Sequence, residues 1–146
     1  RRVAHNMMPE ALIRLGLQQA LQDYCDGLSE SQTFKINSEF YGLQTRLESS
    51  TEVVVYRIVQ ELLNNVVKHS AASIILVQVM KHDNNLTITV EDNGKGFNTD
   101  EVVLQKGTGL KNIQSRVDYL KGQLDIKSVP GKGTSVHIDC IINGNG

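Results

Sequence analysis

One segment constrains the fold of this chain more than any other, the stretch from about residue 50 to residue 68. Its apolar residues recur so densely that a helix built from them is hydrophobic over most of its circumference. They are Val53, Val54, Val55, Ile58, Val59, Leu62, Leu63, Val66 and Val67. β-Branched valines weaken an isolated helix, so burial must stabilise this one. The sequence therefore predicts a long helix packed against a hydrophobic surface formed by other elements.

The remaining apolar residues predict strands and two further helices. Residues 74–81 are mostly apolar, and residues 86–91 alternate between apolar and polar side chains, with Asn84-Asn85 between the two segments. This pattern is typical of a β-hairpin. Residues 34–37, 124–126 and 135–140 indicate three more strands, with a turn at Pro130-Gly131. Amphipathic stripes predict helices over residues 17–28 and 110–120.

The order of these elements indicates the fold class. A helix, a short strand and the long helix come first, followed by strands that one helix interrupts. We therefore expect an α+β fold, a two-layer α/β sandwich in which helices cover one face of a mixed, mostly antiparallel sheet. The 146 residues are enough for one core, so we expect a single domain over residues 10–146. Pro9 would end a helix arriving from upstream, and residues 1–9 are expected to be that helix end and a linker.

Composition excludes several classes of protein. The chain has 15 Lys and Arg against 16 Asp and Glu, a net charge of −1. This balance argues against a nucleic-acid-binding or membrane-binding surface, which needs an excess of basic residues. No apolar run approaches the roughly 18–20 residues of a membrane span. The two cysteines, Cys25 and Cys140, sit apart at apolar positions, which favours core packing in a reducing, cytoplasmic compartment.

The long helix also carries a polar stripe. Its members share one face, at spacings of four, four and three residues, and are Arg57, Glu61, Asn65 and Lys68. One interpretation is a solvated face with an Arg57–Glu61 ion pair. The other is a site for a metal-bound phosphate, because Mg²⁺ prefers oxygen ligands and takes few of them from protein. In that case Asn65 would be the ligand and Lys68 would neutralise phosphate charge.

A second candidate site follows the strand at residues 86–91. Asp92 ends that strand, and Gly94 and Gly96 follow it. The simplest interpretation is a turn. Alternatively, the Asp92 carboxylate would accept a hydrogen bond from an exocyclic amino group such as that of adenine. The two glycines would then let the backbone approach a flat base.

Two more glycine motifs allow both a structural and a functional interpretation. Gly107-Thr108-Gly109-Leu110 opens a helix, where free N–H groups favour phosphate oxygens; otherwise it is a loop with a Thr108 cap. Residues 131–134 form a hairpin turn unless Thr134 points at the base. Neither a dinucleotide-binding G-x-G-x-x-G motif nor a P-loop is present.

Taken together, the four motifs resemble those of the Bergerat-fold ATPases, which include histidine kinases, type II topoisomerases, Hsp90 and MutL. They occur in that family's order across nearly a hundred residues. Within the family, residues 1–146 are most similar to the ATP-binding catalytic domain of bacterial two-component sensor histidine kinases. The nitrate-sensor and membrane-fluidity-sensor subgroup fits best, because residues 61–69 match its N box and residues 98–106 leave room only for a short ATP lid.

The resemblance implies a role for each motif residue. Asp92 would hydrogen-bond the adenine amino group, with Gly94 and Gly96 lining the base and Thr134 supporting the pocket. Asn65 would ligate Mg²⁺, and Glu61 would polarise the nucleophile or a metal-bound water. The remaining implied contacts to the phosphates or ribose, including the hinges and cap of the lid, are Lys68, His69, Gly107, Thr108, Gly109 and Leu110.

The resemblance also implies the activity and the partners. The chain would bind Mg-ATP and, as a protein-histidine kinase, donate the γ-phosphate to a histidine on upstream dimerisation helices, with a response regulator as the further partner. His5 does not match that histidine, because residues 5–9 resemble the end of the second dimerisation helix. The fragment would be the cytosolic part of a sensor, without direct membrane or nucleic-acid contact. The alternatives are an ATP-driven clamp, a serine kinase, or a nucleotide-responsive module without catalysis.

Overall fold

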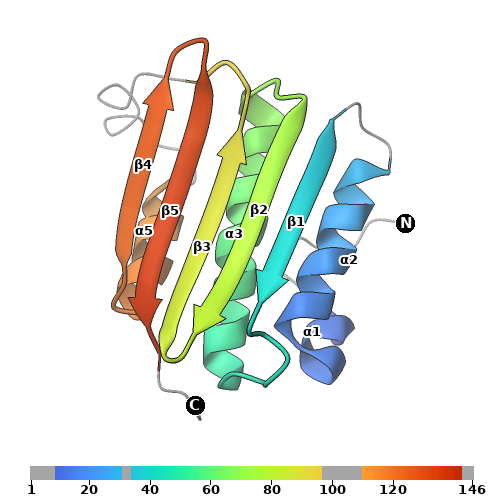
Figure 1. Ribbon diagram of the computed structural model, residues 1–146, viewed down its shortest axis with the longest axis vertical. Coiled ribbons are helices and arrows are strands. Elements are labelled where there is room, and N and C mark those ends of the chain that lie inside the picture. Colours follow the sequence, from blue (N-terminus) through green and yellow to red (C-terminus); the bar gives the residue numbers. More distant parts are fainter. Residues whose placement is uncertain (1–8, 31–33, 97–109, 143–146) are drawn as a thin grey trace.

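The computed structural model describes residues 9–30, 34–96 and 110–142 of the chain. These residues form two layers, with helices packed on one face of a five-stranded sheet (Figure 1). The expected α+β two-layer sandwich is therefore confirmed. The expectation for residues 1–8, the end of an upstream helix, lies outside the described residues.

The elements follow the order that the sequence predicts, with one addition at the start. They are α1 (Glu10–Leu15), α2 (Leu17–Ser29), β1 (Lys35–Tyr41), α3 (Ser49–His69), β2 (Ile74–His82), β3 (Asn85–Asp92), α5 (Leu110–Tyr119), β4 (Gln123–Val129) and β5 (Gly133–Ile141). In the sheet the strands lie in the order β1-β2-β3-β5-β4. Strands β1 and β2 are parallel and joined through α3, while every other neighbouring pair is antiparallel. The sheet is mixed and mostly antiparallel, as expected.

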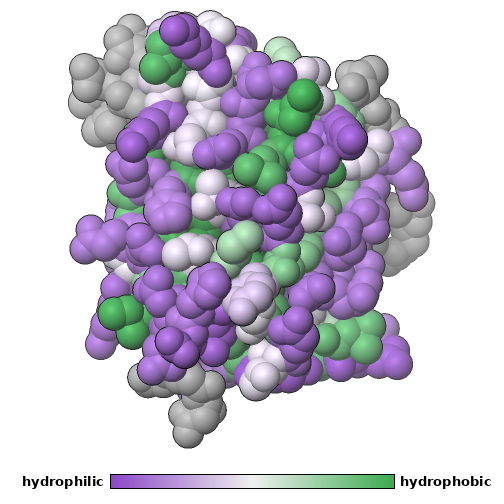
Figure 2. Space-filling view, in the orientation of Figure 1, coloured by the Kyte–Doolittle hydropathy of each residue, from purple (hydrophilic) through white to green (hydrophobic). Residues whose placement is uncertain are grey.

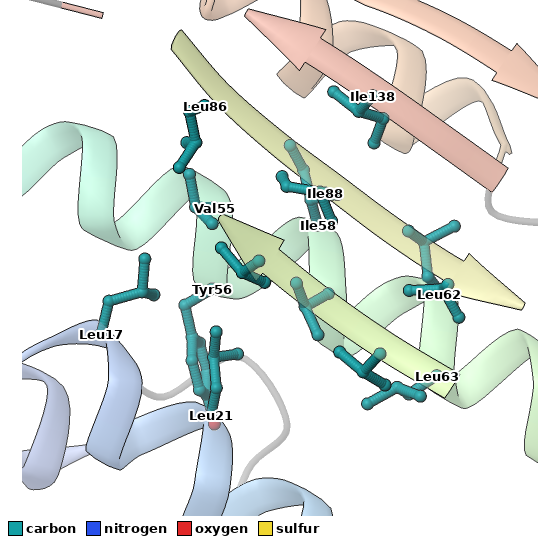
Figure 3. Close-up of a cluster of buried hydrophobic side chains, with 14 of the residues drawn as sticks. Leu17, Leu21, Val55, Tyr56, Ile58, Leu62, Leu63, Leu86, Ile88 and Ile138 are labelled. Carbon is teal, nitrogen blue, oxygen red and sulfur yellow. The ribbon is translucent and has the colours of Figure 1, made fainter. Parts of the chain in front are cut away.

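The core lies between α3 and the sheet. Strand β3 alternates buried and partly exposed residues, so Leu86, Ile88 and Val90 face the helices. From the other layer, Ile58 and Leu62 of α3 pack onto β3 (Figure 3). The opposite face of the sheet carries mostly hydrophilic side chains with scattered apolar ones (Figure 2). One face of the sheet is thus buried and the other exposed, as is common for antiparallel sheets.

An ion pair between an exposed arginine and a buried carboxylate joins the start of α3 to α1. The Glu52 side chain is 4% exposed and lies 2.8 Å from an Arg46 guanidinium nitrogen. Glu52 also accepts a hydrogen bond of 3.1 Å from the N–H of Leu47. The same guanidinium donates to the carbonyl oxygens of Leu12 and Ile13 at the end of α1. This arrangement satisfies a buried carboxylate and caps the short first helix.

Three local expectations differ from the structure. Helix α1 was not expected, because its six residues are too few to show an apolar period before Gly16 interrupts them. Strand β1 extends to Tyr41 rather than ending at residue 37, with Ser38 and Phe40 half-buried on its inner side. The hairpin turn falls at residues 83–84, and Asp83 takes a positive φ of 55° there.

Candidate functional site

The carboxylate of Asp92 lies at a corner where three strand ends meet. Asp92 is the last residue of β3 and pairs with Thr134 at the start of β5. Asp92 is two positions after Val90 in the strand, so the side chains of both residues lie on the helix-covered face of the sheet. The hydroxyl of Thr134 is in turn 2.7 Å from that of Ser128 near the end of β4. The structure therefore brings two of the predicted adenine-site residues, Asp92 and Thr134, side by side.

The environment of this carboxylate leaves it able to bind a further donor. Asp92 is half-buried, and its Oδ1 accepts a hydrogen bond of 2.8 Å from the N–H of Gly94. Burial raises the pKa of Asp92 above its ordinary value, while hydrogen bonds from the backbone of Gly94 and Thr134 oppose that rise. An ionised carboxylate has about four acceptor positions. The spare acceptor capacity at this corner thus fits a ligand that donates a hydrogen bond from an amino group.

The loop after Asp92 is fixed against the end of α3. The N–H of Lys95 donates to the main-chain oxygen of Ser70 at 2.7 Å, and Ser70 directly follows the last residue of α3. The side chain of Asn93 accepts hydrogen bonds from the N–H groups of Ser73 and Ile74, at 2.9 and 3.0 Å. This loop is therefore a rigid connection between the helix end and the carboxylate corner.

The two glycines of the loop are needed by the packing of the chain itself. A Cβ at Gly94 would lie 2.3 Å from the main-chain oxygen of Ser70, and one at Gly96 would lie 2.2 Å from that of Val129. Gly96 also has a φ of +63°, which disfavours other residues. The sequence suggested instead that both glycines make room for a base. The structure gives an internal reason for them, and their contact with a base stays a prediction.

The polar stripe of α3 leads to the same corner. Arg57, Glu61 and Asn65 are partly buried, and Lys68 is exposed in the last turn of the helix. His69, the final residue of α3, is also exposed. Since Ser70 follows directly and contacts Lys95, the turn that carries Asn65 and Lys68 ends against the loop after Asp92. The described contacts thus join the end of the helix that carries the stripe to the loop after Asp92, through Ser70.

One polar contact of this helix was missed by the sequence analysis. The hydroxyl of Tyr24 in α2 donates to Oδ1 of Asn64 at 2.6 Å. Tyr24 occupies an apolar position of its helix, where the sequence treats it as a core residue. The only sequence signal was that a buried phenol needs a hydrogen-bond partner. Asn64 and Asn65 are consecutive, so their side chains project about 100° apart around the helix.

Most of the third motif, residues 107–110, lies outside the described residues. Gly107, Thr108 and Gly109 lie outside the described residues. Leu110 is the first residue of α5, for which the structure describes the backbone. Within the described ranges, no group of three or more His, Cys, Asp or Glu side chains could hold a metal ion. In that same part of the chain, no helix is both long and apolar enough to cross a membrane.

Comparison with curated proteins finds relatives that are named sensor kinases. The chain is 34% identical over 139 residues to the signal transduction histidine-protein kinase/phosphatase DegS of Brevibacillus brevis, covering 94% of this chain and 36% of that protein. It is 32% identical to the sensor histidine kinase ComP of Bacillus subtilis, over 95% of this chain and 18% of ComP. It is 29% identical to the oxygen sensor histidine kinase NreB of Staphylococcus carnosus, over 95% and 40%. The chain therefore spans well under half of these relatives.

Comparison with solved structures supports the same fold. The blue-light activated histidine kinase of Erythrobacter litoralis EL346 superposes with a TM-score of 0.69 at 21% identity, covering 86% of this chain and 40% of that one. The histidine kinase AdeS of Acinetobacter baumannii gives a TM-score of 0.65 at 17% identity, over 86% and 62%. At these identities the likeness concerns the fold.

The family follows from the sequence match together with the corner built by Asp92, Thr134 and the end of α3. The family described as "Histidine kinase-, DNA gyrase B-, and HSP90-like ATPase" matches residues 50–141. That range runs from α3 to the end of β5 and includes the whole of the described corner. The chain belongs to the histidine kinase-, DNA gyrase B- and HSP90-like ATPase family, as its four motifs predict.

Proposed function

We propose that this domain binds Mg-ATP and donates the γ-phosphate to a histidine on upstream dimerisation helices of the same protein. The observation that carries the proposal is the Asp92 carboxylate, which is half-buried with spare acceptor capacity and is followed by a loop that is hydrogen-bonded to the end of α3. Its context is an ATPase family whose matched relatives are named histidine kinases. A nucleotide held at this corner would place its phosphates along the last turns of α3.

The residues around Asp92 would select the base. Asp92 accepts a hydrogen bond from the adenine amino group, and Thr134 fixes that carboxylate through its backbone N–H. The Ser128–Thr134 hydroxyl pair keeps the start of β5 in place. Gly94 and Gly96 let the loop pack closely enough to close the pocket around the base.

The stripe of α3 would handle the phosphates. The Asn65 carboxamide oxygen is a suitable Mg²⁺ ligand, and the cation, when bound, neutralises charge on the phosphate oxygens. Lys68 and His69 lie exposed at the helix end, where either could contact phosphate or ribose. Glu61, one turn before Asn65, would polarise the attacking group. Gly107, Thr108, Gly109 and Leu110 would form the lid hinge and its cap at the start of α5.

Such a site catalyses by positioning and charge neutralisation, and the nucleophile comes from elsewhere. In this proposal residues 10–146 are the catalytic domain, and residues 1–9 are the end of the second dimerisation helix and a linker. The phosphoacceptor histidine lies upstream, and a response regulator receives the phosphoryl group. The domain would work in the cytoplasm, as the cytosolic part of a membrane-bound sensor.

The experiment supplies the natural protein that carries this domain, including its dimerisation helices, with γ-labelled ATP and Mg²⁺. We expect acid-labile, base-stable label on a histidine outside residues 10–146. Replacing that histidine with Gln should abolish labelling while leaving ATP binding intact. Acid-stable label on a serine would favour a serine kinase, and sustained hydrolysis without label would favour an ATP-driven clamp. ATP binding with neither outcome would leave a nucleotide-responsive module; any of these three results contradicts the proposal.

A further inference from the structure

A hydrogen bond ties α2 to the part of α3 that carries the predicted phosphate-binding residues. The Tyr24 hydroxyl donates to Oδ1 of Asn64 at 2.6 Å, across 40 positions of sequence. The ring of Tyr24 also meets that of Tyr56 edge-on, with centroids 6.0 Å apart and planes at 73°. The ring contact anchors the phenol, and the hydroxyl reaches the residue immediately before Asn65.

This turn of α3 has little hydrophobic burial of its own. Leu62 and Leu63 are the last core residues of the helix, at 4% and 0% exposure. Asn64, Asn65 and the two valines that follow are only partly buried, and the final two residues of the helix are exposed. Apolar burial therefore fixes the first four turns of α3, up to Leu63, more firmly than the residues that follow, and hydrogen bonds must orient those residues.

Hydrogen bonds hold this final part of α3 both at its end and on its side. At its end, the main-chain oxygen of Ser70 accepts from Lys95, and the Ser70 hydroxyl donates to the carbonyl of Val66 at 2.8 Å. On the α2 side, Tyr24 holds Asn64. The Ser70 contacts fix where the helix stops. The Tyr24 hydrogen bond acts on the side chain of Asn64, away from the axis of α3. It therefore resists rotation of this part of the helix about that axis.

The Tyr24 hydroxyl acts as a donor under all physiological conditions. Burial raises the pKa of Tyr24 far above its ordinary value, and the nearby Glu61 carboxylate adds to that rise. The phenol therefore keeps its proton, and the Asn64 oxygen stays engaged as the acceptor.

We propose that Tyr24 is a positioning residue for phosphoryl transfer: by holding Asn64, it fixes the rotation of the turn that presents Asn65 to the metal. This inference rests on the proposed function, since it takes Asn65 as the Mg²⁺ ligand. Mg²⁺ is sensitive to such a rotation, because it demands near-ideal octahedral geometry with oxygens at about 2.0–2.1 Å. A small displacement of Asn65 should weaken Mg²⁺ binding more than it weakens the contact between Asp92 and the base.

The test measures ADP binding by calorimetry, with and without Mg²⁺, on wild type and on Tyr24→Phe. The Phe ring keeps the contact with Tyr56 and removes only the hydroxyl. We expect Tyr24→Phe to bind ADP without metal as tightly as wild type does. Its Mg²⁺ requirement, the Mg²⁺ concentration that gives half of the metal's effect on ADP binding, should rise about five-fold, the factor that corresponds to one net hydrogen bond. Asn64→Ala should produce the same change by a second route. The double variant should add little to either single variant, because both remove the same interaction.

Tyr56→Phe is the matched control, because it removes a hydroxyl from the same aromatic pair without touching Asn64. Its Mg²⁺ requirement should equal that of wild type. A merely structural Tyr24 would lower the melting temperature of Tyr24→Phe with no change in Mg²⁺ requirement, and that result overturns the inference. Failure of the proposed function looks different: wild type itself would bind ADP with no dependence on Mg²⁺, and the inference would fall with it.

Discussion

The main-chain oxygen of Ser70 accepts a hydrogen bond of 2.7 Å from the N–H of Lys95, and this contact joins the end of α3 to the loop that follows Asp92. Two residues that are 25 positions apart in sequence thereby define one corner of the molecule. The end of α3 and the loop that follows the Asp92 carboxylate meet at that corner. The account of nucleotide binding depends on this junction remaining closely packed.

Substituting the glycine at this junction should break it. In Gly94→Ala the added Cβ would lie 2.3 Å from the Ser70 oxygen, a backbone atom that cannot move without shifting the helix end. We expect a loss of about 1–3 kcal/mol in the free energy of unfolding, measured with chemical denaturant, and weaker ATP binding. Gly27→Ala is the control: open space surrounds Gly27 inside α2, so stability should rise by about 0.5–1 kcal/mol. Equal stability of the two variants would refute the packing explanation.

Removal of the Asp92 charge should weaken nucleotide binding. Asp92→Asn replaces a charge-assisted hydrogen bond to the adenine amino group, so the binding free energy of ATP should fall by about 1.5–3 kcal/mol in calorimetry. Glu91→Gln is the neighbouring control, because Glu91 is exposed and bonds to Ser135 on the open face. The control should bind ATP like wild type. An Asp92→Asn protein with wild-type affinity would exclude this residue from base recognition.

The same substitution should change how stability depends on pH. Burial raises the pKa of Asp92 in the folded protein above the ordinary value of 3.8. The folded state then holds this proton more tightly than the unfolded chain, so wild type loses stability as pH rises through the interval between the two pKa values. Asp92→Asn lacks this loss. Without nucleotide, it should gain on wild type as pH rises above about 4 and then level off. Parallel stability curves for the two proteins would contradict the burial effect.

The buried carboxylate of Glu52 predicts a loss of stability far from the site. Glu52→Ala leaves the buried N–H of Leu47 without its acceptor and removes the partner of Arg46. We expect the free energy of unfolding to fall by about 1–3 kcal/mol. Glu48→Ala, an exposed position that makes no side-chain cap, should change stability by less than about 0.5 kcal/mol. If both variants unfold at the same denaturant concentration, Glu52 does not hold α1 to α3.

Periodicity identified the long elements well, because their burial is written in the spacing of apolar residues. The expected helix over residues 50–68 is observed as Ser49–His69, and the hairpin pairs as predicted. Helix α1 was not predicted, because its six residues cover fewer than two turns. Its orientation also depends on Arg46, a residue far away in the sequence. A single sequence contains no local signal for a contact of that kind.

The sequence supplied candidate residues for the site but not the contacts that those residues make in the fold. Strand alternation was enough to identify Asp92 as a carboxylate at an otherwise apolar position. The motifs did not reveal that Gly94 packs on Ser70 or that Tyr24 holds Asn64. Both contacts join segments that are far apart in the chain, and both depend on how α3 and its last residue are placed in the fold. The roles of the predicted site residues remain predictions for the measurements above.

If Asp92 and Asn65 contact two parts of one bound nucleotide, calorimetric titration of ATP will separate their contributions. Wild type, Asp92→Asn and Asn65→Ala are each titrated with and without Mg²⁺. We expect Asp92→Asn to weaken ATP binding under both conditions, whereas Asn65→Ala should keep the metal-free affinity and lose the increase in affinity that Mg²⁺ brings. Wild-type affinity for Asp92→Asn, or an undiminished Mg²⁺ effect for a folded Asn65→Ala protein, would contradict this expectation.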